Sequence, residues 1–140
     1  MRAAGRPHVV AVATHPIQYH APWFHALANR TEFSFDALFV TIPDAEHQGT
    51  GFGVPFQWDV PLRDGYDSAQ IEGVTGSGAI GQFWATRLRD AGSVLNNHRA
   101  DVLILTGWQS LPLVQLLQAA RRRRIPTVVR GESSGLNLRP

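Results

Sequence analysis

The chain has 140 residues, 44% of them apolar and 17% charged, which fits one globular domain with its own core and excludes a disordered chain. It has no cysteine, which excludes disulfides and thiolate sites. The 13 residues of the lysine and arginine class are all arginine, yet a net charge of +2 is too small to predict nucleic-acid binding. No segment reaches the roughly 18 to 20 apolar residues that a membrane span needs, so we expect a cytoplasmic protein.

The first third of the chain alternates strand and helix patterns. Residues 8–14 form a nearly continuous β-branched run, as in a strand buried on both faces. A helix is predicted to begin near Pro22, and residues 35–41 are predicted to form the second strand.

The apolar pattern breaks down over residues 43–81, where only residues 56–62 have the pattern of a short strand. A helix is then predicted over residues 82–97, because Trp84, Leu88 and other apolar side chains recur at helical spacing.

The last third is the most regular. Residues 101–106 predict a strand, Ser110 is the expected N-cap of a helix that closes with Arg121–Arg124, and residues 127–130 predict the last strand. Five strands and three helices predict a single α/β domain over residues 1–140, a Rossmann-like, doubly wound parallel sheet.

Gly76, Gly78 and Gly81 match the spacing of a dinucleotide-binding loop, but no convincing strand precedes them. We therefore interpret this segment as a flexible loop before a helix N-terminus.

Ligands of such sheets bind beyond the carboxyl ends of the strands. After the first strand, His15 is predicted to be catalytic, as a hydrogen-bond donor or acid/base, and Gln18 and Tyr19 to bind an acceptor. The alternative for His15 is a structural histidine that bonds to the backbone at a strand end.

Two further loops are predicted to lie at the same edge. Trp108, Gln109 and Ser110 offer a stacking face and polar groups to a sugar, although a tryptophan there is also common in a core. After the last strand, Arg130 and Ser133 are predicted to bind the acceptor and Glu132 to be catalytic; the alternative is a salt bridge at a domain boundary. The predicted acceptor-binding and catalytic residues are therefore His15, Gln18, Tyr19, Trp108, Gln109, Ser110, Arg130, Glu132 and Ser133.

Other site classes find less support. No metal site is expected, because cysteine and an HExxH helix are both absent and His15 and His20 are poorly spaced. No Ser-His-Asp order or carboxylate pair is recognisable. The run Arg121, Arg122, Arg123 and Arg124 fits a solvated helix end; alternatively it binds anionic lipid headgroups, at the inner face of a membrane.

Four segments, in this order, together resemble the N-terminal domain of bacterial family-four glycosyltransferases. They are Thr14-His15-Pro16-Ile17-Gln18-Tyr19; Gly51-Phe52-Gly53 with Trp58-Asp59-Val60-Pro61-Leu62 and Gly65-Tyr66; Gly107-Trp108-Gln109-Ser110; and Val129-Arg130-Gly131-Glu132-Ser133. The resemblance implies a GT-B fold, in which this domain binds the acceptor and a C-terminal domain binds the nucleotide sugar. It implies no metal and no cofactor other than that donor.

Three departures limit what the resemblance implies. His15-Pro16 replaces the Gly-Gly pair of many relatives, and Gly107-Trp108 stands where many have a histidine that touches the donor sugar. The 140 residues include no donor domain, so we expect a separate donor-binding domain or subunit as partner and no activity from this chain alone. The alternatives are a non-catalytic carbohydrate- or anion-binding module and a flavodoxin-like nucleotide-binding domain; the latter lacks a phosphate loop.

Overall fold

The structure, a computed structural model, describes residues 5–42, 62–77 and 81–131. Its elements are, in chain order, β1 (His8–Ala13), α1 (Ala21–Ala28), β2 (Ser34–Phe39), β3 (Asp67–Gln70), β4 (Val74–Gly76), the 3-10 turn η1 (Phe83–Ala85), β5 (Thr86–Leu88), α2 (Ala91–Asn97), β6 (Val102–Leu105), α3 (Leu111–Arg122) and β7 (Thr127–Val129).

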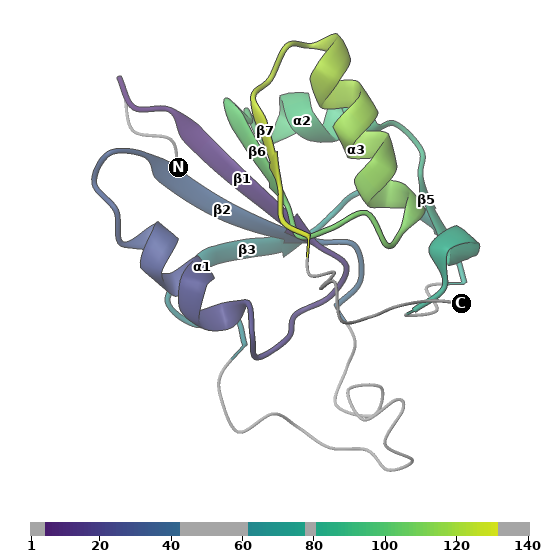
Figure 1. The fold of residues 1–140 in the computed structure, drawn as a ribbon, viewed down its shortest axis with the longest axis horizontal. Coiled ribbons are helices and arrows are strands. Elements are labelled where there is room, and N and C mark those ends of the chain that lie inside the picture. Colours follow the sequence, from purple (N-terminus) through teal and green to yellow (C-terminus); the bar gives the residue numbers. More distant parts are fainter. Residues whose placement is uncertain (1–4, 43–61, 78–80, 132–140) are drawn as a thin grey trace.

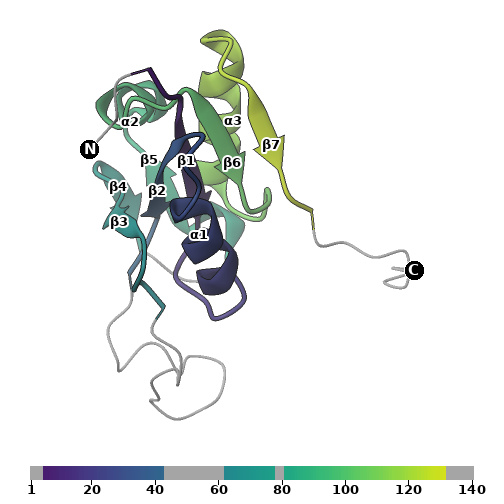
Figure 2. The ribbon, with the colours of Figure 1, turned by 90° about the vertical axis from the view of Figure 1, so that its left-hand side faces the viewer.

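Five strands form one parallel sheet in the order β3-β2-β1-β6-β7 (Figure 1). The helix α1 covers one face, and α2 and α3 cover the other (Figure 2). The predicted α/β, Rossmann-like, doubly wound sheet is therefore confirmed. The strand order reverses between β1 and β6, and sheets of this kind bind ligands at that reversal.

Strand β1 is buried along its whole length because it lies at the centre of the sheet. Its side chains alternate between the two faces, as the pleat requires. Val9 and Ala11 pack on the side of Phe24 in α1, whereas Val10 and Val12 belong to the core under α2 and α3. The continuous apolar run predicted this double burial.

The predicted helix over residues 82–97 is wrong in its first half. That half forms η1 and β5, and β5 pairs antiparallel with β4 in a separate two-stranded sheet. Helix α2 begins only after Asp90, whose carboxylate accepts hydrogen bonds from the backbone N–H and the hydroxyl of Ser93. The helical spacing of Trp84 and Leu88 was misleading, because Trp84 is 79% exposed whereas Leu88 is buried.

Strands β3 and β4 lie where the sequence pattern predicted no regular structure. The sequence of β3, Asp67–Gln70, has almost no apolar character, and the strand forms through backbone pairing with β2 at the edge of the sheet. The strand predicted at residues 56–62 lies outside the described residues except for Leu62.

The interpretation of the glycine-rich segment as a loop before a helix is also wrong. Gly76 ends β4, and Gly81 precedes a 3-10 turn of three residues instead of an α-helix. Gly78 lies outside the described residues. A strand therefore does run into this motif, contrary to the prediction, but the described residues after it begin with a 3-10 turn and offer no α-helix N-terminus of the kind that phosphate binding needs.

Candidate functional site

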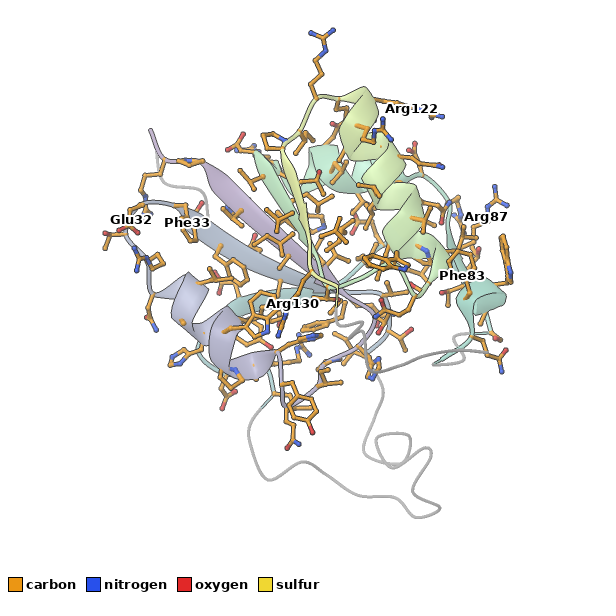
Figure 3. All side chains as sticks on the ribbon, in the orientation of Figure 1. Glu32, Phe33, Phe83, Arg87, Arg122 and Arg130 are labelled. Carbon is orange, nitrogen blue, oxygen red and sulfur yellow. The ribbon has the colours of Figure 1, made fainter. Side chains whose placement is uncertain are left out.

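The loops that follow β1, β6 and β7 lie side by side because these strands are neighbours in the sheet. The backbone N–H and hydroxyl of Thr106 both donate to the carbonyl of Val12, at 3.1 and 3.2 Å. The backbone N–H of Arg130 donates to the carbonyl of Leu105 at 2.8 Å. Arg130 lies where the strands converge (Figure 3). The structure therefore brings together the first two predicted loops and the start of the third, Arg130 and Gly131.

In the first loop, His15 is half-buried and its Nδ1 lies 2.9 Å from the Thr14 hydroxyl. Burial lowers the pKa of His15 below its ordinary value, because the imidazolium form loses solvation. A neutral ring has one donor and one acceptor nitrogen, which suits hydrogen bonding to a sugar hydroxyl. Gln18 is half-buried and Tyr19 is 72% exposed, so the side chain of Tyr19 is open to solvent.

Arg130 is held by a residue of α1. Its guanidinium carbon lies 5.3 Å from the centroid of the Trp23 ring, a cation–π contact. His20 packs edge-on against the same ring, with centroids 5.6 Å apart. The sequence indicated Trp23 only as one apolar residue of the helix, because helical spacing does not show which side chain reaches a loop 107 positions later.

Trp108 connects the second loop with the third. A Cβ atom on Gly131 would lie 3.0 Å from the Trp108 ring, so the ring lies directly against the chain after β7. Trp108 is nevertheless 56% exposed and can offer a stacking surface. The side chain of Gln109 lies over Gly107, whose φ of +151° is in a region that favours glycine.

Two buried polar atoms at this edge have no hydrogen-bond partner among the described residues: the indole Nε1 of Trp23 and the hydroxyl of Ser110. Ser110 is the N-cap residue of α3, as predicted, but its side chain makes no capping hydrogen bond. The first N–H groups of α3 therefore receive no capping bond from Ser110, and a helix N-terminus carries a partial positive charge. Unpaired buried donors are rare and call for a partner.

Glu132 and Ser133 lie outside the described residues. The four arginines Arg121–Arg124 are exposed at the C-terminal end of α3, and Arg122 lies far from Arg130 (Figure 3).

The described residues contain no group of three or more histidine, aspartate or glutamate side chains that could hold a metal ion. No helix in this part of the chain is long and apolar enough to cross a membrane. Comparison with models of protein families, with characterised proteins and with solved structures finds no match to this chain.

Proposed function

We propose that this chain is the acceptor-side half of a glycosyltransferase. In this proposal it binds a sugar-containing acceptor, and a separate donor-binding domain or subunit supplies the nucleotide sugar. The supporting observation is the pair of unpartnered buried donors, Trp23 Nε1 and Ser110 Oγ, at the edge where three loops meet. A ligand with several oxygen acceptors, such as a sugar, is the kind of partner that such donors need.

The neighbouring side chains would each contact a different part of the acceptor. Trp108 offers an exposed ring for stacking on a sugar face, and Gln109 offers an amide. Arg130, oriented by Trp23, adds a fixed positive charge for a phosphate or carboxylate on the acceptor. Gln18 and Tyr19 extend the same surface along the first loop.

The catalytic assignments are His15 and Glu132. A neutral His15 can accept a proton from the attacking hydroxyl of the acceptor. Glu132, two residues after Arg130 in sequence, would contribute a carboxylate to the same edge. Transfer also needs the charges and positioning of the donor half, so neither residue is expected to act without it.

Arg130→Ala is the test of acceptor binding. The variant should bind a phosphorylated or carboxylated sugar about 10-fold or more weakly, because it loses a charge-assisted hydrogen bond worth about 1.5–3 kcal/mol. Titration calorimetry on the chain with glucose 1-phosphate and glucuronate measures the change. Arg87→Ala is the matched control, since Arg87 is exposed on β5 in the separate hairpin. Equal binding by the two variants would contradict the assignment.

A non-catalytic carbohydrate- or anion-binding module is the second candidate. The excess of hydrogen-bond donors at the carboxyl edge favours this second candidate. Arg130, the α3 N-terminus and the two unpartnered groups could hold an anion without catalysing a reaction. Addition of a donor-binding domain separates the two candidates. Sugar transfer upon its addition supports the glycosyltransferase, and unchanged binding without transfer supports the module.

We also propose, as a minor part of this function, that Arg121–Arg124 hold the protein at an anionic membrane surface. All four side chains are exposed at the C-terminal end of α3, where Arg122 lies away from Arg130 (Figure 3). Co-sedimentation with vesicles that contain phosphatidylglycerol, compared with neutral vesicles, tests this contact.

A further inference from the structure

At the amino ends of the strands, opposite the candidate site, β1 and β2 bring together His8, Ser34 and Asp36. His8 pairs with Ser34 in the ladder, and Asp36 follows two positions later, on the same face of β2. The Ser34 hydroxyl lies 2.6 Å from His8 Nδ1, and an Asp36 carboxylate oxygen lies 2.9 Å from His8 Nε2. His8 is only 3% exposed, whereas Ser34 and Asp36 are half-buried.

The partners fix the direction of these hydrogen bonds. An ionised carboxylate only accepts, so Nε2 carries the hydrogen and donates to Asp36. Nδ1 is then the acceptor, and the Ser34 hydroxyl donates to it. This is the order of a serine nucleophile, a histidine base and an orienting aspartate, with the two ring nitrogens exchanged relative to the usual arrangement.

A cavity of about 460 Å³ lies beside this row, and Ser34, His8 and Asp36 all line it. Arg6 and Tyr66 line the same cavity. One N–H of Arg6 donates to the carbonyl of Thr31 at 3.0 Å, which leaves other guanidinium donors for a ligand. The Ser34 hydroxyl therefore lies at a recess that a small ligand can enter.

We propose that Ser34 is the nucleophile of a hydrolytic site for small carboxylic esters. The Ser34 oxygen bonds to the ester carbonyl carbon while its proton moves to His8 Nδ1, and Arg6 stabilises the resulting oxyanion. The C–O bond to the alcohol then breaks, and the alcohol takes the proton from His8. Water attacks the acyl-serine, gives its proton to His8, and the carboxylic acid leaves as Ser34 regains the proton.

Asp36 acts in this scheme as a positioning residue, because its carboxylate accepts the hydrogen bond from His8 Nε2 and so holds the tautomer in which Nδ1 accepts. The site uses none of the residues at the carboxyl edge. It therefore does not depend on the proposed glycosyltransferase function, and either proposal can fail without the other.

A fluorophosphonate probe tests the nucleophile on the full chain. We expect a covalent adduct on Ser34, located by peptide mass spectrometry, and slow release of p-nitrophenol from p-nitrophenyl acetate. Ser34→Ala should abolish the adduct and lower the esterase rate at least about 100-fold. Ser68→Ala is the matched control: Ser68 lies on β3 and accepts a hydrogen bond from Arg63, so its loss should leave labelling intact.

The roles of His8 and Asp36 need variants that keep the fold. Asp36→Asn should slow labelling at least about 100-fold at an unchanged melting temperature, and Asp36→Glu should restore part of the rate. His8→Gln should also prevent labelling, and circular dichroism establishes whether it folds. A folded wild-type chain without an adduct on Ser34, or Ser34→Ala with the wild-type esterase rate, would overturn the proposal.

Discussion

Arg130 shows how one side chain at the carboxyl edge depends on residues that are distant in sequence. Its backbone is fixed by the carbonyl of Leu105 in β6, and its guanidinium lies over Trp23 in α1. A cation–π contact of this kind contributes about 0.5–1 kcal/mol where it is exposed. Its larger effect is to restrict the rotamers of a long side chain, so that less entropy is lost when a ligand binds.

His15 gives a prediction about pH. Burial lowers its pKa in the folded chain, so the unfolded chain binds this proton more tightly. The contribution of His15 to stability is therefore complete above its ordinary pKa of 6.5 and is lost as the pH falls below that value. Urea unfolding between pH 5 and 8 should show stability decreasing toward low pH, and His15→Gln should reduce this slope. An unchanged slope in the variant would contradict the prediction.

At the scale of elements, the β4–β5 hairpin is the largest departure from the regular alternation of strands and helices. It is joined to the rest of the fold through Leu88, which is buried in the core beneath α2 and α3. The side chain of Gln115 in α3 makes hydrogen bonds with both the N–H and the carbonyl of Leu88, at 2.8 and 3.0 Å. Gly76 is the last residue of β4 and pairs with Thr86, so it belongs to the hairpin itself.

Gly76 and Gly81 provide a matched pair of substitutions in this hairpin. Both have positive φ, at +111° and +87°, but a Cβ on Gly76 would lie 2.1 Å from the carbonyl oxygen of Ala85, whereas Gly81 has open space. Gly81→Ala should lower the free energy of unfolding by about 1–2 kcal/mol, from backbone strain alone. Gly76→Ala should cost about 3 kcal/mol or more, or should release the hairpin.

Thermal unfolding measures the stability of both variants. Hydrogen exchange at Ser77, whose N–H donates to the carbonyl of Ala85 at 2.9 Å, detects local release of the hairpin. Equal stability and equal exchange in the two variants would show that the Ala85 contact does not matter.

At the scale of the whole molecule, the sheet ends at β7. This strand pairs only with β6 among the described strands, and Val128 is 57% exposed on it. An edge strand with an exposed apolar side chain is a template for association with another chain.

We expect the chain to self-associate through β7 and to become more monomeric when Val128 is replaced by arginine. A charge on an edge strand disfavours edge-to-edge pairing, and an exposed substitution should change stability by less than about 0.5 kcal/mol. Sedimentation velocity over a range of concentrations measures the mass. A wild-type chain that stays monomeric at high concentration would contradict this prediction.

The second prediction at this scale concerns turnover. The chain alone should release no nucleotide from a panel of nucleotide sugars with simple acceptors, because transfer needs groups on both sides of a cleft. A coupled assay for nucleotide release measures it. Steady turnover without an added donor-binding partner would show that these 140 residues hold a complete active site.

The amino-acid sequence by itself determined the central layers of the fold. The apolar runs of β1 and β6 and the amphipathic pattern of α3 predicted a parallel sheet with covering helices. A strand that is buried on both faces needs an apolar side chain at nearly every position, so its sequence identifies it. The position of Ser110 before α3 was also predicted. Strand β3 was not, because an edge strand is held by backbone pairing that its side chains do not encode.

Only the tertiary structure decided which side chains meet. The spacing of Trp84 and Leu88 was compatible with a helix, but Leu88 lies in β5, which is a strand because it pairs with β4. Likewise no local pattern relates Trp23 to Arg130, or His8 to Ser34 and Asp36. These contacts exist because parallel strands bring residues that are far apart in sequence to the same edge of the sheet, and the register that does so is a property of the assembled sheet.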